Sequence, residues 1–284
     1  MTSVDAALLP AGVHRADVVT LRDGVARPTA DWLADEVAVS LVFNGVAQAV
    51  MMATPADLED FALGFALTEG LLLTRDELYD VEVVPVPLGI ELLLNVSSAC
   101  AWRLRERRRT MAGRTGCGLC GTEQLAQVRR ELPAVPVVRT SVSAMARAQR
   151  ELAGHQVIQR LTGAAHAAAW CGREGDVRIV REDVGRHNAL DKLVGAVLRA
   201  GLSTADGFVS ITSRASFEMV QKTAAAGAGA LAAVSAPTGL AVATAQRLGV
   251  ALAGFVRGGD AVAYTFPERF TLDAPTPVTD HGHR

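Results

Sequence analysis

The chain has 284 residues, 50% of them hydrophobic, and a formal net charge of −2. A chain of this length can bury roughly 75% of the surface that it exposes when unfolded, so we expect one large domain or two smaller ones. The small net charge gives no overall reason to bind nucleic acid or anionic membranes, and any anion site must therefore be a local cluster.

The first residues show no secretory leader, because Asp5 and Pro10 interrupt them and no apolar run follows a basic start. The stretch 223–246 has no charged residue, but its glycines, proline and many alanines indicate buried α/β core rather than a membrane span. We therefore expect a cytoplasmic protein without a membrane segment, in a compartment where disulfides are rare.

Local patterns in the first half predict an α+β unit. Asn44-Gly45 is a typical tight turn of a hairpin, and Thr54 is the expected N-cap of a helix of about four turns. The predicted strands are 18–21, 37–43, 46–51, 81–86 and 90–96, and a charged helix is predicted over 102–110.

Strands and helices alternate in the second half. After helices over 122–132 and 143–152, the patterns predict strands 177–181, 208–212, 231–235, 251–256 and 261–266, with helices 188–199, 217–226 and 238–248 between them. This alternation indicates a mainly parallel sheet covered by helices, with an antiparallel last strand after Gly258-Gly259. Ligands of such sheets bind at the strand ends, here 182–183, 213–214, 235–237 and 257–258.

These elements predict an α/β protein of two domains. The expected boundaries are 1–112 for an N-terminal α+β domain, 113–140 for a cysteine loop and connecting helix, 141–270 for an α/β domain and 271–284 for a flexible tail.

The peptide Thr115-Gly116-Cys117-Gly118-Leu119-Cys120-Gly121 carries two thiols three residues apart among three glycines. Structural zinc would need two further ligands, and the other cysteines, Cys100 and Cys171, have no matching spacing. A thioredoxin-like dithiol would follow a strand and begin a helix, whereas this pair lies among glycines after a charged segment. The third interpretation is a sulfur relay, in which a thiolate accepts sulfane sulfur as a persulfide.

Other charged motifs have a structural and a functional interpretation. The basic run 103–109 is typical of a solvated helix face, or it binds an anion near the thiols. In the segment 181–192, His187 could pair with Asp191, and Arg186 with Glu182 or Asp183, unless the segment is only a capping network.

Two strand-end motifs are candidates for binding phosphate or a nucleotide. Ser213-Arg214-Ala215-Ser216 precedes a helix whose N-terminus favours anions, although Ser216 also suits an ordinary N-cap. The stretch 255–260 combines an arginine, two glycines and an acid, which fits a ligand site or a tight turn.

Several long motifs occur in one order and resemble the formate dehydrogenase accessory sulfurtransferase (FdhD) family over nearly the whole chain. The matching stretches are Phe43-Asn44-Gly45, Phe61-Ala62-Leu63-Gly64-Phe65, Glu106-Arg107-Arg108-Arg109, Gly113-Arg114-Thr115-Gly116-Cys117-Gly118-Leu119-Cys120-Gly121, His166-Ala167-Ala168, Glu182-Asp183-Val184-Gly185-Arg186-His187, Ser213-Arg214-Ala215-Ser216 and Gly254-Phe255-Val256-Arg257.

The resemblance implies a sulfurtransferase that takes persulfide sulfur from a cysteine desulfurase. The sulfurtransferase would deliver the sulfur to the molybdenum bis(molybdopterin guanine dinucleotide) cofactor, before that cofactor is inserted into the formate dehydrogenase catalytic subunit. Cys117 would carry the persulfide, with Cys120 as its partner. The residues expected at the cofactor are His166, His187, Ser213, Arg214, Phe255, Val256, Arg257, Gly258, Gly259 and Asp260.

The resemblance also implies a three-layer, cytidine-deaminase-like second domain, without deaminase chemistry. His166-Ala167-Ala168 lacks the glutamate that zinc deamination needs two residues after the histidine. We expect a homodimer, no permanently bound metal and no nucleic-acid partner. The alternative function is a molybdenum-cofactor chaperone whose cysteines are redox-active or protective. Asp260 departs from the more basic ending that the resemblance implies at the cofactor site.

Overall fold

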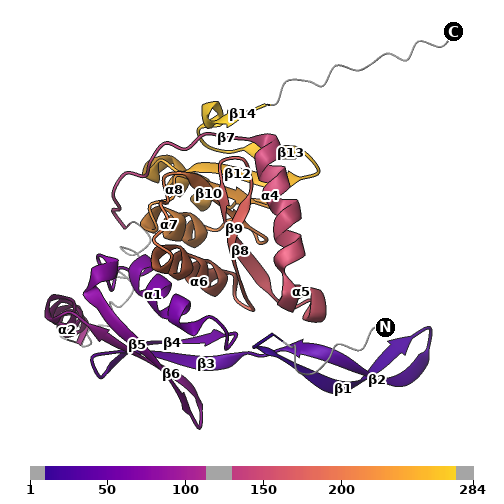
Figure 1. Cartoon of the computed structure of the whole chain (residues 1–284), viewed down its shortest axis with the longest axis horizontal. Coiled ribbons are helices and arrows are strands. Elements are labelled where there is room, and N and C mark those ends of the chain that lie inside the picture. Colours follow the sequence, from indigo (N-terminus) through magenta and orange to yellow (C-terminus); the bar gives the residue numbers. More distant parts are fainter. Residues whose placement is uncertain (1–9, 113–129, 273–284) are drawn as a thin grey trace.

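The computed structural model of the chain describes residues 10–112 and 130–272, apart from the side chains of 107–112. It is a mixed α/β structure with two large sheets, a projecting hairpin and helices on both faces of the larger sheet (Figure 1). Among the described residues, no helix is both long and apolar enough to cross a bilayer. The uncharged stretch 223–246 belongs to two helices and the buried strand between them.

The residues before 113 form the hairpin and the smaller of the two large sheets. Their elements are β1 (Val13–Arg22), β2 (Val25–Ala34), β3 (Val37–Phe43), β4 (Val46–Ala53), α1 (Leu58–Thr68), η2 (Arg75–Glu77), β5 (Leu78–Val86), β6 (Gly89–Val96) and α2 (Ser98–Ala112). The predicted strands 37–43, 46–51, 81–86 and 90–96 and the helix 102–110 are confirmed, most of them with longer bounds. The sequence patterns do not predict β2, and the predicted strand 18–21 is only the outer part of β1.

The smaller sheet has the strand order β4-β3-β6-β5. Its turn between β3 and β4 uses Asn44 and Gly45, both at positive φ (44° and 80°), as a tight hairpin requires. Alternate side chains of the strands point toward α1 and form one core with it, including Val39, Leu41, Phe43, Leu92, Leu94, Phe61 and Phe65. The opposite face of this sheet has no helix packed on it (Figure 1) among the described residues.

Helix α1 begins later than the sequence predicts. Its N-cap is Asp57, at φ 52° and without a side-chain capping bond, and the helix has 11 residues. Thr54 does not cap it, because this buried residue bonds to the second half of the chain instead. The Thr54 amide donates to Asp183 Oδ2 (3.0 Å), and its hydroxyl accepts from the Val184 amide (3.1 Å).

The residues after 130 build the larger sheet and its helices. Their elements are β7 (Thr140–Ser141), α4 (Val142–His155), α5 (Val157–Thr162), β8 (His166–Gly172), β9 (Val177–Asp183), α6 (Arg186–Arg199), β10 (Gly207–Ile211), α7 (Phe217–Ala225), β11 (Ala230–Ala233), α8 (Gly239–Leu248), β12 (Ala251–Arg257), β13 (Asp260–Ala263), η3 (Pro267–Arg269) and β14 (Phe270–Thr271). The eight strands and helices predicted from 177 on are confirmed to within a few residues.

The larger sheet has the order β13-β12-β11-β10-β8-β9, and the prediction of a mainly parallel sheet is wrong. Only β10 with β11 and β11 with β12 pair in parallel. The other three neighbouring pairs are antiparallel. Two of them arise because β8 lies between β9 and β10, and the third is the pair β12 and β13. The antiparallel last strand after Gly258-Gly259 is confirmed.

Helices cover both faces of the larger sheet. One core joins α6, α7 and α8 to the sheet and includes the fully buried Trp170, Leu190 and Leu193. The other core lies under α4 and includes Met145, Leu152 and Phe208. Both cores use many alanines, so the helices approach the strands closely.

Helices α1 and α6 connect the two large sheets through a close crossing. A Cβ atom on Gly64 would lie 1.7 Å from the Asp191 carbonyl oxygen, and one on Gly195 would lie 1.9 Å from the Asp60 carbonyl oxygen. Only glycine allows the two backbones this approach at these positions.

Two predictions concern residues at the limits of the description. Most of the predicted helix 122–132 lies outside the described residues, and 130–132 are not helical. Thr271, the first residue of the predicted tail, pairs in β14 with Ser141, and 273–284 lie outside the description. The four domain boundaries stay predictions.

Candidate functional site

The predicted ligand residues gather along the edge of the larger sheet that is formed by the C-terminal ends of its strands. Strands β9, β10, β11 and β12 all end there, since β9 and β10 both run antiparallel to β8. His166 begins β8 and pairs in register with Asp183, the last residue of β9. His187 lies in the first turn of α6, and Ser213 and Arg214 follow β10. The edge therefore brings together side chains that are up to 94 positions apart, counted from His166 to Asp260.

Backbone contacts fix the loops at this edge. Ala215 forms a parallel bridge with Pro237, in which the Ala215 amide donates to the Ala236 carbonyl and the Thr238 amide to the Ala215 carbonyl. The Phe255 amide donates to the Ser235 carbonyl at 3.4 Å. The loops after β10, β11 and β12 therefore form one connected rim.

Phe255 has an unusual backbone conformation in this rim. Its φ is 53°, a value that a bulky residue rarely adopts, and β12 has a register shift between Gly254 and Arg257. The shift leaves the Phe255 ring 36% exposed, with the Arg257 guanidinium 5.8 Å from its centre. Strain of this kind costs of order 1–3 kcal/mol and is common where a ligand binds.

The rest of the stretch 255–260 is divided between core and turn. The Val256 side chain is fully buried in the core under α4, so only its backbone can face a ligand. Gly258 and Gly259 turn the chain at φ 62° and 103°, and the exposed Asp260 pairs in register with Arg257. Phe255 and Arg257 therefore offer the side chains that a ligand can reach.

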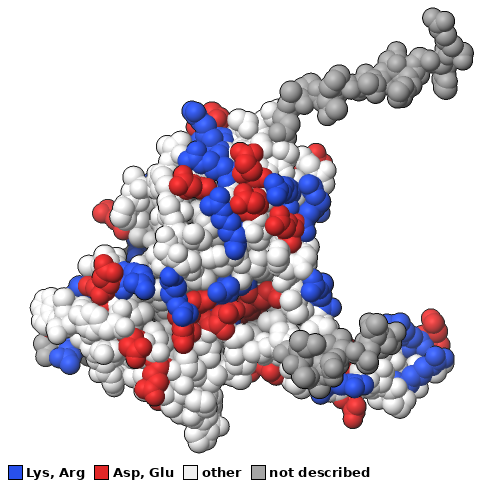
Figure 2. Space-filling model, in the orientation of Figure 1, with Lys and Arg blue, Asp and Glu red and all other residues white. Residues whose placement is uncertain are grey.

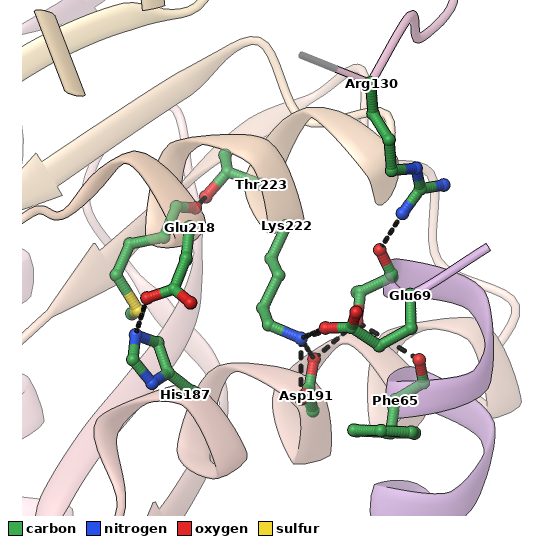
Figure 3. A network of polar contacts seen from close by, with 10 residues as sticks. Phe65, Glu69, Arg130, His187, Asp191, Glu218, Lys222 and Thr223 are labelled. Atoms are coloured by element: carbon green, nitrogen blue, oxygen red, sulfur yellow. Dashed lines mark hydrogen bonds and ion pairs between the residues drawn. The ribbon is translucent and has the colours of Figure 1, made fainter. Parts of the chain in front are cut away.

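Two half-buried histidines lie near the same edge. Burial lowers the pKa of His166, and the nearby charge of Arg186 lowers it further. Burial also lowers the pKa of His187, although Glu218 opposes the shift. His187 Nε2 lies 2.9 Å from Glu218 Oε2 (Figure 3), so the predicted partner Asp191 is wrong.

Asp191 belongs instead to a buried network that joins α1, α6 and α7 (Figure 3). Lys222 Nζ lies 3.0 Å from both Asp191 oxygens and 2.6 Å from Glu69 Oε1, and it donates to the Thr68 hydroxyl at 3.0 Å. Burial raises the pKa of Asp191. Burial disfavours the charged form of Lys222, but the carboxylates of Asp191 and Glu69 outweigh it and raise the pKa of Lys222.

The acids just before α6 have structural partners as well. Asp183 lies 2.7 Å from Lys192 Nζ, with both side chains fully buried. Glu182 accepts from the amides of Ile158 and Gln159, both at 2.9 Å, and so caps α5. Neither acid pairs with Arg186 among the contacts of the described residues. The interpretation as a capping network is confirmed for Glu182, whereas Asp183 is held by a buried ion pair and by the Thr54 and Gly185 amides.

Ser216 and Arg186 lie beside the predicted ligand residues but are not among the residues that the resemblance places at the cofactor. Ser216 occupies the N-cap position of α7 but makes no capping bond, and its buried hydroxyl has no hydrogen-bond partner within the described part of the chain. Arg186 lies close enough to lower the pKa of both His166 and His187. The combination of two arginines, Arg186 and Arg214, with a helix N-terminus suits an anionic ligand.

Cys117 and Cys120 lie outside the described residues. The other two cysteines are fully buried, and burial raises the pKa of both Cys100 and Cys171, which makes thiolate formation unfavourable. Arg130 is the first described residue after the cysteine segment. Its guanidinium donates to the Thr68 carbonyl at the end of α1, beside the Lys222 network (Figure 3).

The described residues do not form a metal site, since they include no group of three or more His, Cys, Asp or Glu side chains placed to hold an ion. The basic run 103–109 is only partly described. Arg103 pairs with Glu77 at 2.6 Å, Arg105 is exposed, and the side chains from 107 on lie outside the description.

Comparisons with known proteins find similarity over most of the chain. The model of the FdhD/NarQ family matches residues 34–271. A relative from Variovorax paradoxus named sulfur carrier protein FdhD is 58% identical over 95% of this chain and 97% of its own length. A relative of the same name from Bordetella petrii is 54% identical over 90% of this chain and 94% of its own length.

A solved structure supports the fold. The protein, from Desulfotalea psychrophila, is assigned as a formate dehydrogenase accessory protein and is 22% identical to this chain. It superposes with a TM-score of 0.73, covering 92% of this chain and 100% of its own. With the family model matching from residue 34 to residue 271 and curated relatives sharing more than half of their residues with it, this chain belongs to the FdhD/NarQ family.

Proposed function

We propose that this protein is a sulfur carrier that serves the maturation of formate dehydrogenase. The observation that carries the proposal is the 58% identity, over 95% of the chain, to a relative named sulfur carrier protein FdhD. The pair Cys117 and Cys120 supplies the nucleophilic sulfur that such a carrier needs. The donor is a cysteine desulfurase, the final recipient is the formate dehydrogenase catalytic subunit, and the reaction takes place in the cytoplasm.

Sulfur enters by thiolate exchange. The Cys117 thiolate attacks the terminal sulfur of the desulfurase persulfide, a new S–S bond forms, and the electron pair of the broken S–S bond leaves with the desulfurase thiolate. No net oxidation occurs in this step. Cys120 is the partner thiol. When the carried atom passes on as sulfane sulfur, the electron pair of the broken S–S bond stays on Cys117, which returns to a thiolate.

The acceptor substrate is the molybdenum bis(molybdopterin guanine dinucleotide) cofactor, bound at the edge where β9 to β12 end. Arg186, Arg214 and the N-terminus of α7 would hold its phosphates. The Ser216 hydroxyl, which has no hydrogen-bond partner among the described residues, gives this edge a donor, and the exposed Phe255 ring gives it an apolar surface for a guanine base. Asp260 pairs in register with Arg257 across the turn.

The fold proposed for this function has two domains, of which the second is a three-layer, cytidine-deaminase-like domain. Two helical layers on one six-stranded sheet support it, because α4 packs on one face and α6, α7 and α8 on the other. No permanently bound metal is part of the proposal.

The experiment is persulfide labelling of the full-length protein after incubation with a cysteine desulfurase and cysteine. Cys117→Ala should abolish the label, while GDP binding, measured by calorimetry, stays within twofold of the unaltered protein. Phe255→Ala should do the reverse, with normal labelling and at least tenfold weaker GDP binding. If Cys117→Ala still takes up the label, the sulfur-carrier role of Cys117 is wrong. If the unaltered protein binds GDP but takes up no label, the protein is a cofactor chaperone.

A further inference from the structure

Strand β9 is the last strand on one side of the larger sheet, and among the described strands it pairs only with β8. On β8, the Ala167 amide donates to the Thr212 hydroxyl and its carbonyl accepts from the Thr212 amide, so Ala167 faces β10. Its partner in register on β9 is Glu182, which therefore turns its amide and carbonyl away from β8. Val180, two residues earlier, does the same because successive residues alternate.

The free side of β9 is a template for a further strand. Backbone groups at such a side readily pair with another chain, and folded proteins usually cover them. The Arg181 guanidinium covers one group, since it donates to the Val180 carbonyl at 2.8 Å. The amides of Val180 and Glu182 and the Glu182 carbonyl also face outward, so this side of the sheet needs a cover.

A groove of about 520 Å³ lies along the free side of β9. Apolar side chains from two elements form much of its wall: Val157 and Ile158 from α5, and Val177 and Val180 from β9. Figure 2 shows acidic and basic side chains interspersed over the part of the molecule that holds the larger sheet, without a field of one sign. The groove therefore suits a mainly apolar, extended segment.

The start of the described chain lies in this groove. Pro10 and Ala11 line it. Gly12 follows them and packs on Thr54, because a Cβ atom there would lie 2.3 Å from Thr54 Cγ2. The Thr54 amide in turn bonds to Asp183, the last residue of β9. A segment that precedes Pro10 and follows the groove would thus run parallel to β9 and reach its C-terminal end last.

The residues before Pro10 match the groove in composition and length. Residues 1–9 lie outside the description, and residues 4–9 have the sequence Val-Asp-Ala-Ala-Leu-Leu, with five apolar side chains and one charge. Six extended residues span about 20 Å, close to the roughly 23 Å of a seven-residue strand such as β9. The segment is therefore long enough to cover the free side of β9.

We propose that residues 4–9 lie in this groove as a seventh strand of the larger sheet, parallel to β9. Carbonyl groups of the segment accept from the amides of Val180 and Glu182, and its apolar side chains cover Val157, Ile158 and Val177. The segment thereby prevents β9 from pairing with another chain. It precedes residue 34, where the match to the family model begins, so the proposal does not depend on the sulfur-carrier function.

The test is amide hydrogen exchange, followed by NMR, in the full-length protein and in a variant that lacks residues 2–9. The amides of Val180 and Glu182 should exchange at least tenfold faster in the shortened chain. The amides of β10, in the centre of the sheet, should exchange at the same rate in both proteins, because the core is unchanged.

Two point variants of the full-length chain form a matched pair. L8D/L9D should speed the exchange of the Val180 and Glu182 amides at least tenfold, because side chains alternate along a strand and one of the two aspartates must enter the groove. T2D/S3D adds the same charge outside residues 4–9 and should leave both rates within twofold.

The proposal is overturned if Val180 and Glu182 exchange at the same rate in the full-length and the shortened chain, whether that rate is fast or slow. If the amides of β10 also exchange faster in the shortened chain, the point variants decide. Faster exchange at Val180 and Glu182 alone in L8D/L9D then supports the proposal, and equal rates in L8D/L9D and T2D/S3D overturn it.

Discussion

The titratable residues at the sheet edge take their properties from contacts that are distant in sequence. His187 lies one helical turn from Asp191 but pairs with Glu218, 31 positions away. Asp191 in turn is saturated by Lys222 and Thr68. The sequence shows which charged residues lie near a strand end. Tertiary packing decides which of them remain available to bind a ligand.

His187 should make stability dependent on pH below its ordinary pKa of 6.5, because burial lowers its pKa in the folded protein. In that window the unfolded chain binds a proton that the folded protein does not, so the free energy of unfolding falls as the pH decreases. His187→Gln should make this fall shallower between pH 7 and pH 5, by up to about 1.4 kcal/mol per pH unit. Urea unfolding at a series of pH values measures it.

The matched control is His155→Gln, which replaces an exposed histidine at the end of α4. Its slope should equal that of the unaltered protein. An unchanged slope in His187→Gln would mean that Glu218 stabilises the charged imidazole as strongly as burial opposes it.

At the scale of elements, the close crossing of α1 and α6 gives a direct prediction. Gly64→Ala places a methyl group 1.7 Å from the Asp191 carbonyl oxygen, so the two helices must separate and their shared contacts weaken. We expect a loss of about 2 kcal/mol or more in the free energy of unfolding, measured in urea.

Gly154→Ala is the control for this change, because Gly154 lies in helix α4 and a Cβ atom there meets nothing within 4 Å. The same chemical change should stabilise the protein by up to about 1 kcal/mol, as alanine favours helix more than glycine does. Equal effects of the two substitutions would show that α1 and α6 can move apart at no cost.

The elements that the sequence predicts well are those with a strong local signal. Asn44-Gly45 defines the β3–β4 hairpin, and Thr238 caps α8 through the Ala241 amide as its residue type suggests. The strand β8 was missed because its core is Ala167–Ala169, and alanine has little preference for strands. Without β8, the remaining alternation indicated a parallel sheet.

The start of α1 shows a second kind of error. Thr54 and Pro55 are typical of a helix N-terminus, yet Thr54 bonds to Asp183, Val184 and Lys192 from the other half of the chain. No local pattern contains those partners. The gathering of these strand-end residues was predictable because strand ends are read from local pattern. The Ser216 hydroxyl, which has no hydrogen-bond partner among the described residues, could be recognised only in three dimensions.

At the scale of the whole molecule, buried ion pairs couple the two large sheets. Asp60, on α1, accepts from Arg181 on β9 and Arg199 on α6 at 2.6 to 2.8 Å. Asp183 and Lys192 form a fully buried pair, and Lys192 also donates to the Thr54 carbonyl at 2.9 Å. Separating the two sheets would break the Asp60 ion pairs and the bonds of Asp183 and Lys192 to Thr54, and it would expose the Asp183–Lys192 pair to water. We therefore expect the described parts on either side of α1 and α6 to unfold together.

Native-state hydrogen exchange tests this coupling. In the unaltered protein, the amides of β3 and β10 should open with the same free energy, because neither sheet opens without exposing the buried pairs. Lys192→Met should lower the free energy of unfolding by about 3–5 kcal/mol, as it leaves Asp183 buried without its counter-charge. The control Arg178→Met breaks the exposed pair with Asp176 and should cost less than about 1 kcal/mol. If β3 opens at a lower free energy than β10 in the unaltered protein, the two sheets are separate folding units and the ion pairs between them contribute little.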